Sequence, residues 1–209
     1  MVDIKEADLN DETIQRARDF HGHLCAGLTI GIRAAQIALR EIGPHSADEE
    51  VVAVVETDMC AVDAIQLLMG CTFGKGNLIH LDYGKNAYTF IRRSDGKAIR
   101  IVSRPDGWPP DAPERKAIFD KMQTGTANVE DERRYAELQE ERALAVMGIL
   151  EEELFEVKEV AAVVPQKARL NASIRCEECG EPTMETRIRR FSGRNLCIPC
   201  FEKVEARRA

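Results

Sequence analysis

Four cysteines near the end of the chain place the strongest constraint on its fold. Cys176, Cys179, Cys197 and Cys200 form two CxxC pairs that are separated by seventeen residues. A CxxC pair can turn tightly enough to hold two thiolates on one edge of a tetrahedron, and the segment between the pairs has room for a β-hairpin. Four thiolates fill the coordination shell of a zinc ion, so the spacing predicts a closed, structural zinc ribbon.

The segment around these cysteines contains few large apolar residues, so we expect metal binding to supply most of its folding energy. Its arginines could form a basic face for nucleic acid, or they could lie on a solvated hairpin that contacts protein. Residues 170–209 hold eight Lys and Arg against six Asp and Glu, in a chain of net charge −7, which favours the protein contact. The arginines are Arg187, Arg189, Arg190 and Arg194.

The rest of the chain predicts an α+β domain. Apolar positions at spacings of three and four predict helices, and short β-branched runs between glycines predict strands. The expected helices are one that ends near Phe20 and those over residues 27–42, 61–70, 111–123 and 128–150. The expected strands are 51–57, a three-stranded antiparallel meander within 77–104, and 154–165. We therefore predict a core domain over residues 1–168, with a mostly antiparallel sheet packed with helices, and the ribbon over residues 169–209.

The composition indicates a protein of the cytoplasm. The longest apolar stretches are far shorter than the roughly 20 residues that a membrane-spanning helix needs. The first twenty residues alternate charged and apolar side chains and lack the continuous hydrophobic region of a secretory signal. The cysteines number seven, and four of them lie in CxxC pairs. Metal or redox chemistry with reduced thiols therefore fits this usage better than a set of disulfides.

The stretch "DFHGHLCAGLTIG", residues 19–31, collects His21, His23 and Cys25 just before an apolar run. In an extended backbone all three would share one face, and in a helix only His21 and Cys25 would align. Either arrangement gives at least two ligands that can reach one ion. Cys25 also precedes the first turn of the predicted helix, where free N–H groups favour a thiolate. The alternative is a polar entry to a buried helix, because free cysteines are often buried.

A second segment, "VETDMCAVDAIQLLMGCTFGKGN", supplies candidate partners for the first. Cys60 and Asp63 follow a predicted core strand, and Cys71 and Lys75 lie in the glycine-rich loop after the next helix. Sites in α/β proteins usually form at strand ends and in the loops that follow them. The run "GCTFGKG" is not a phosphate-binding loop, because its first glycine is one residue too close and no Ser or Thr follows Lys75.

Three segments together resemble the signature segments of the FmdE family, which takes its name from formylmethanofuran dehydrogenase. They are "FHGHLCAGLTIGIRAA", "VETDMCAVDAIQLLMGCTFGKGNL" and "DYGKNAYTF". The resemblance covers roughly residues 15–165, and the ribbon matches the longer members of that family. One departure is visible, because Cys25-Ala26-Gly27 stands where the family often has Cys-Pro-Gly. The loss of a proline weakens the helix start slightly and leaves the ligand in place.

The resemblance implies an α+β core that forms an intertwined homodimer. It also implies a metal or active site lined by His21, His23, Cys25, Cys60, Asp63, Cys71 and Lys75. It does not carry the dehydrogenase activity to this chain, because the catalytic centre of that enzyme belongs to other subunits. The chain also lacks the cysteine runs of a ferredoxin-type iron–sulfur carrier.

Our first hypothesis is a metal-binding protein, accessory to formylmethanofuran dehydrogenase or to related one-carbon or redox metabolism. Cys25 and one or both of His21 and His23 would hold a zinc-like ion, with Cu or Ni as alternatives, and Cys60 would assist. If the site is catalytic, Cys25 and Cys60 would serve the reaction, with Asp63 as a base or a histidine-orienting group. Lys75 would then hold an anionic group.

Two further hypotheses remain. In one, the protein is a regulator whose core senses metal or redox state and whose ribbon contacts a protein or nucleic acid. In the other, it is a structural subunit in which the motif residues only pack a dimer. Trp108, which lies among prolines, is expected to anchor a loop or a dimer contact rather than to hold a substrate.

Overall fold

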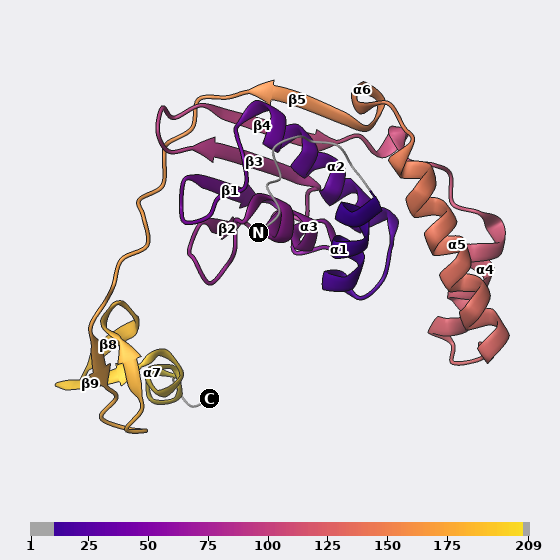
Figure 1. Cartoon of the computed structure of the whole chain (residues 1–209). Coiled ribbons are helices and arrows are strands. Elements are labelled where there is room, and N and C mark those ends of the chain that lie inside the picture. Colours follow the sequence, from indigo (N-terminus) through magenta and orange to yellow (C-terminus); the bar gives the residue numbers. More distant parts are fainter. Residues whose placement is uncertain (1–10, 207–209) are drawn as a thin grey trace. The chain divides into compact units, whose positions relative to one another are not determined.

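The structure, a computed structural model, describes residues 11–206 and divides into two compact units, one up to Lys167 and one from Ala168 onward (Figure 1). Residues 1–10, which carry half of the segment considered for a secretory signal, lie outside the described residues. Within residues 11–206, no helix combines the length and apolar character needed to cross a membrane.

The first unit is built on a five-stranded sheet in the order β2-β1-β3-β4-β5. Three of its four pairings are antiparallel, and β1 with β2 is parallel. The mixed α+β class with a mostly antiparallel sheet is therefore confirmed. The strands are β1 (Val51–Val55), β2 (Leu78–His80), β3 (Ala87–Arg92), β4 (Ala98–Ser103) and β5 (Phe155–Glu159).

The predicted three-stranded meander is wrong in its first strand. β3 and β4 form the expected hairpin, but β2 pairs with β1 and runs in the same direction. The helix between β1 and β2 is the reason, because it returns the chain to the end where β1 began, as in other parallel crossovers. β2 therefore becomes an edge strand next to β1.

The last strand is also shorter than predicted. The chain enters it from a single helical turn, α6 (Glu151–Leu154), and β5 ends at Glu159. Its partner β4 begins at Ala98, whose carbonyl accepts from the N–H of Val160 at 3.0 Å. Beyond Val160 the partner strand offers no further residue to pair, so residues 161–165 leave the sheet.

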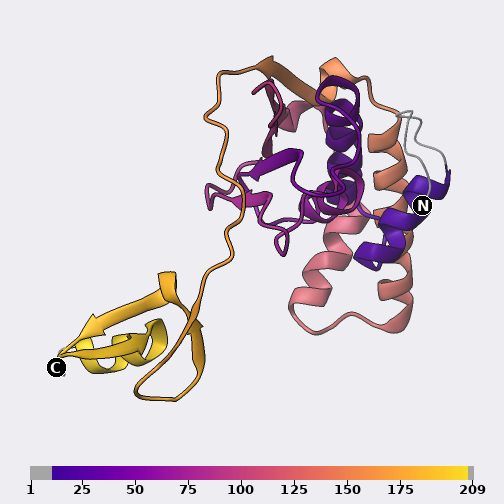
Figure 2. The ribbon, with the colours of Figure 1, turned by 60° about the vertical axis from the view of Figure 1, so that its left-hand side comes forward.

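Helices α1, α2 and α3 gather on one face of this sheet (Figure 2). Side chains alternate along β1, so that Val51, Ala53 and Val55 join the main core with these helices while Val52 joins a small cluster on the opposite face. The predicted helices are confirmed with small changes at their ends. The helices are α1 (Asp11–His21), α2 (Ala26–Glu41), α3 (Ala61–Met69), α4 (Pro113–Gln123) and α5 (Val129–Met147).

Helix α5 packs on α2, and one partly buried arginine ties the two together. Arg33 of α2 donates to the carbonyls of Met147 and Ile149, at 2.7 and 2.9 Å, where α5 ends. Helices leave their last carbonyls unsatisfied, so Arg33 supplies donors that the backbone lacks. Helix α4 lies alongside α5, and the two form a hairpin at one end of the sheet (Figure 1).

The second unit is small and holds the four cysteines. Its apolar core consists of Leu196 and three buried cysteines. Phe191 and Phe201 pack against this core, and their two rings meet edge to face. Two short hairpins and one helix surround that core. They are β6 (Ser173–Arg175) with β7 (Pro182–Met184), β8 (Ile188–Phe191) with β9 (Arg194–Cys197), and α7 (Ile198–Glu205).

Candidate metal centres

Three side chains from three helix ends meet in the first unit, and we call them the core cluster: His21, Cys25 and Cys60. His21 ends α1, Cys25 immediately precedes α2, and Cys60 immediately precedes α3. One ligand atom from each lies within 4.8 Å of the other two. Nε2 of His21 is 4.0 Å from Sγ of Cys25. These donors are close enough to hold one ion.

The turn between α1 and α2 brings His21 back over Cys25. Gly22 adopts φ 92°, a left-handed conformation that ends α1, and its N–H donates to the carbonyl of Arg18 at 2.7 Å. Cys25 is extended, and its sulfur accepts from the N–H of Leu28 at 3.4 Å, which caps α2. The segment is therefore neither wholly extended nor wholly helical, and it brings His21 and Cys25 together without His23.

Two glycines on α2 bring Cys60 to the same place. A Cβ on Gly31 would lie 2.2 Å from the carbonyl oxygen of Ala61, the first residue of α3. A Cβ on Gly27 would lie 3.2 Å from Cβ of Cys60. The start of α3 can approach α2 this closely because Gly31 has no side chain that would collide with its backbone, and a side chain at Gly27 would be in tight contact with Cys60. The pair of glycines four residues apart is the sequence signal for this approach, and the prediction of the site from its ligands alone missed it.

Asp63 orients the histidine of the core cluster. Its Oδ2 lies 2.7 Å from Nδ1 of His21, and an ionised carboxylate can only accept, so Nδ1 carries the proton. The lone pair of Nε2 is then free on the side that faces Cys25. Metal-binding histidines usually have a carboxylate on the nitrogen that does not bind the metal.

The thiol of Cys60 is partly buried. This burial is the main cause that raises its pKa to about 11, and the neighbouring Cys25 adds to the effect.

His23 lies outside the core cluster. Its ring centroid is 4.7 Å from that of His21, and its side chain is exposed. Partial burial of its ring, followed by the charge of the neighbouring His21, lowers its pKa. The structure therefore places His23 beside the cluster, with its ring tilted against that of His21, and the group of donors that can reach one ion does not include it.

Lys75 and Cys71 lie at the other end of α3 from Cys60. The Nζ of Lys75 donates to the carbonyl of Ser46 at 2.8 Å, and the N–H of Ser46 in turn donates to the carbonyl of Met69, the last residue of α3. A helix of this length spans roughly 13 Å. Cys71 is fully buried, its thiol donates to the carbonyl of Val51, and burial raises its pKa to about 12. Neither side chain reaches the core cluster.

The four ribbon cysteines converge as their spacing predicts. Their sulfurs lie within 4.8 Å of one another, and those of Cys179 and Cys197 are 3.9 Å apart. Zinc–sulfur bonds of about 2.3 Å in a tetrahedron require sulfurs about 3.8 Å apart, so the set fits zinc. The sulfur of Cys176 accepts N–H groups, first that of Cys197 at 3.3 Å and then that of Cys179, and these lower its pKa to about 6.

Comparison with known proteins gives two family matches. Residues 20–156 match the family described as "FmdE, Molybdenum formylmethanofuran dehydrogenase operon", and residues 171–206 match the "Prokaryotic dksA/traR C4-type zinc finger". A curated relative from Archaeoglobus fulgidus, named "Probable S-adenosyl-L-methionine-binding protein", is 35% identical over 192 residues. The match covers 88% of this chain and 51% of the relative, so the chain spans about half of that protein's length.

A solved structure shares the fold. It is the crystal structure of a tungsten formylmethanofuran dehydrogenase FmdE-like protein from Syntrophus aciditrophicus. The match has a TM-score of 0.57 at 22% identity and covers 94% of each chain. The match therefore includes residues of both units, and at this identity it shows a similarity of fold alone.

Proposed function

The chain belongs to the FmdE family, and from this premise we propose that its first unit binds a metal ion through His21, Cys25 and Cys60. The resemblance and the four-cysteine zinc ribbon, both predicted from the sequence, are confirmed. The observation that carries the proposal is the convergence of three donor atoms within 4.8 Å, with Asp63 on the remaining nitrogen of the histidine.

The donor set favours a zinc-like ion. One imidazole and two thiolates make a mixed nitrogen and sulfur site, which suits zinc and leaves copper or nickel as alternatives. Three protein ligands leave a fourth position open for water or a substrate, and an ion with such a position can polarise what binds there. Asp63 holds the imidazole in the tautomer that exposes Nε2. His23 and Lys75 take no part in this set.

Metal content tests the proposal. We expect the full chain to hold two ions, one in the ribbon and one in the core, and we expect His21→Ala and Cys60→Ser each to hold only one. Asp63→Asn should retain the core ion but bind it about 10 to 100 times more weakly, because it orients a ligand without being one. Elemental analysis of untagged protein gives the stoichiometry, and competition with a chelator gives the affinity.

Cys71→Ser is the matched control for this experiment. It makes the same replacement of sulfur by oxygen in a buried thiol that lies outside both clusters. Its metal content should therefore equal that of the wild-type chain. A single ion in the wild-type chain, or an unchanged content in Cys60→Ser, would exclude the core site. Circular dichroism of each variant separates loss of the ion from loss of the fold.

We also propose that the protein acts in the cytoplasm as a homodimer, accessory to formylmethanofuran dehydrogenase or to a related redox protein of one-carbon metabolism. Family membership supports this role. The α4–α5 hairpin supports association, because Phe119, Met122 and Leu144 each expose at least two fifths of their surface.

The alternative role is that of a regulator whose core senses metal or redox state and whose ribbon contacts a partner. In the ribbon, Arg194 pairs with Glu178 at 2.6 Å, which favours protein over nucleic acid as that partner.

Binding of S-adenosyl-L-methionine is a second candidate, favoured by the name of the relative from Archaeoglobus fulgidus. The match covers most of this chain but only half of that protein, so the ligand could belong to either half. Calorimetric titration of the full chain with S-adenosyl-L-methionine shows whether the half that matches this chain binds the ligand. Saturable binding supports the candidate, and the absence of heat at millimolar ligand assigns the property to the half that this chain does not match.

A further inference from the structure

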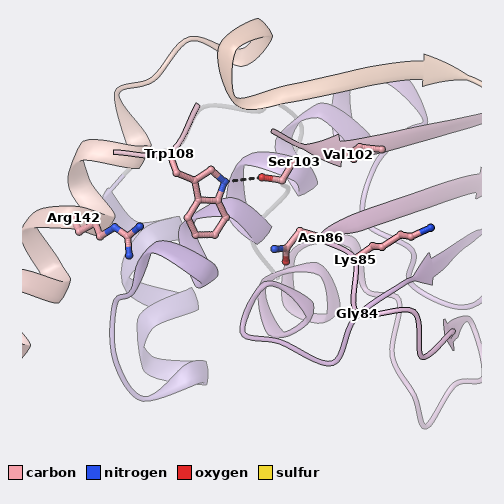
Figure 3. Close-up of a pocket in the computed structure, with 7 residues that line it drawn as sticks. All are labelled: Gly84, Lys85, Asn86, Val102, Ser103, Trp108 and Arg142. Atoms are coloured by element: carbon pink, nitrogen blue, oxygen red, sulfur yellow. Dashed lines mark hydrogen bonds between the residues drawn. The ribbon is translucent and has the colours of Figure 1, made fainter. Parts of the chain in front are cut away.

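A hollow of about 590 Å³ opens in the first unit. It lies at the end of the sheet where β1 and β4 end and β3 begins. Its size lies within the range of small-molecule sites. The backbone N–H of Lys85 on its rim donates to the carbonyl of Glu56, four residues before Cys60, at 2.8 Å. It is lined by Gly84, Lys85, Asn86, Val102, Ser103, Trp108 and Arg142 (Figure 3).

The indole of Trp108 forms a fixed wall of this pocket. Its Nε1–H donates to the hydroxyl of Ser103 at 2.8 Å, so the ring is held against the end of β4 (Figure 3). The preceding residue, Gly107, packs under α6, and a Cβ there would lie 2.2 Å from the carbonyl oxygen of Glu153. Trp108 therefore anchors its loop, as its sequence context predicts, and also presents a flat apolar surface to the pocket.

Arg142 brings a positive charge that has no ion-pair partner among the described residues. Its guanidinium lies 5.8 Å from the centroid of the Trp108 ring, and it donates to the carbonyl of Pro109 at 3.4 Å. Its Nε is buried and has no hydrogen-bond partner among residues 11–206. On the same helix, by contrast, Arg133 and Arg134 each pair with at least two glutamates. The pKa of Asp111 is lowered mainly by its hydrogen bond to Arg115 and to a smaller extent by the charge of Arg142, with which it forms no salt bridge. A half-buried cation without a direct ion-pair partner is costly and favours an anionic ligand.

Asn86 provides a second donor across the pocket from Arg142. Its Oδ1 accepts from the hydroxyl of Tyr88 at 3.4 Å, which leaves the N–H groups of its amide for a ligand. In Figure 3 this amide points toward Trp108, while the ammonium of Lys85 points away from the indole. The pocket thus combines one apolar wall with two donors from different elements.

We propose that this pocket binds a small organic anion that carries a flat ring. The ring would pack against Trp108, the anionic group, a phosphate or a carboxylate, would accept hydrogen bonds from Arg142, and Asn86 would donate to an acceptor at the other side of the ligand. The site does not depend on a metal in the core cluster, because none of its lining residues belongs to that cluster.

Fluorescence of Trp108 offers a direct test, because it is the single tryptophan of the chain. We would titrate the full chain with adenosine 5′-monophosphate and with nicotinate, which present a ring with a phosphate and a ring with a carboxylate. Adenosine and inorganic phosphate are the comparison ligands that lack the charge or the ring. We expect saturable binding of at least one ring anion and at least tenfold weaker binding of both comparison ligands. Adenosine loses the charged hydrogen bond and inorganic phosphate loses the packing of the ring, and each contributes about that factor.

Variants locate the binding. Arg142→Gln and Asn86→Asp should each weaken the ring anion about tenfold or more, since the first removes the charge and the second replaces a donor by a carboxylate. Arg133→Gln is the control, because it is the same substitution on the same helix outside the pocket. Calorimetry repeats each measurement, since Arg142→Gln alters the surroundings of the fluorophore. Asn86 is exposed, so its variant tests the site even if Arg142→Gln fails to fold.

Several outcomes would overturn the proposal. Equal affinity for adenosine and adenosine 5′-monophosphate would exclude an anion site, and equal affinity for inorganic phosphate would exclude the role of the ring. No binding of either ring anion at millimolar concentration would exclude the pocket as a site for this class. Equal weakening in Arg133→Gln and Arg142→Gln would place the binding elsewhere.

Discussion

Replacing Cys176 with serine is expected to unfold the ribbon and to remove one zinc ion from each chain. Cys176 is 2% exposed and is the sulfur to which the backbone of Cys197 donates, so it joins the two CxxC pairs even before metal is considered. The apolar core of this unit is one leucine with two partly buried phenylalanines. That is too little to fold about 40 residues, so the ribbon depends on its metal. Structural zinc contributes roughly 10–16 kcal/mol to the folding of small zinc domains.

Limited proteolysis with elemental analysis checks this expectation. The variant should be cut rapidly by trypsin at the ribbon arginines, and residues up to Lys167 should resist as in the wild-type chain. A chelator added to the wild-type chain should have the same effect on the ribbon. Cys71→Ser should keep both its zinc and its resistance. A ribbon that stays resistant after zinc is removed would show that the apolar contacts alone fold it.

Replacing Gly31 with alanine is expected to have the largest effect on the first unit. The new Cβ would lie 2.2 Å from the carbonyl oxygen and 2.6 Å from the Cα of Ala61, so the backbone of α3 must move. Overpacking of a core costs about 1–3 kcal/mol or more, and a domain of this size loses roughly 2–4 °C of Tm per kcal/mol. We therefore expect a fall in Tm of roughly 5–10 °C. An alanine would otherwise stabilise a helix by about 1 kcal/mol, so the sign of the change is diagnostic.

The same substitution should also weaken the core metal site, because α3 carries Cys60. Thermal unfolding and chelator competition measure the two effects. Gly148→Ala is the control, since its Cβ would meet only the carbonyl oxygen of Ala145, at an ordinary 3.7 Å, and its φ is −86°. An unchanged or raised Tm in Gly31→Ala would mean that α2 and α3 are not held in this close contact.

Local signals in the sequence predicted the main helices and one hairpin of the first unit. Helical periodicity located α2, α3 and α5, and the short β-branched runs between glycines located the β3–β4 hairpin. The parallel pairing of β2 was missed, because strand direction depends on where the intervening helix returns the chain. The length of β5 was missed because a strand ends where its partner ends, and its partner β4 lies more than 50 residues earlier.

The candidate sites divide in the same way. His21 and Cys25 are four residues apart, so one turn decides their contact. Cys60 and Asp63 were proposed from their motif, and the structure brings them to His21 through the contact of α2 with α3. Lys75 belongs to the same motif, yet α3 separates it from the cluster. The pocket of Trp108 and Arg142 had no sequence signal, because its lining comes from three separate parts of the chain, residues 84–86, 102–108 and 142.

The sequence alone determined the ribbon, the α+β class and the family, because each rests on spacing or on motifs within short segments. Only the tertiary structure decided which motif residues meet. Two glycines let α3 approach α2 and unite Cys25 with Cys60, and the direction of α3 carries Lys75 away. Contacts of this kind depend on how far two backbones can approach each other, a quantity that no single segment of the sequence contains.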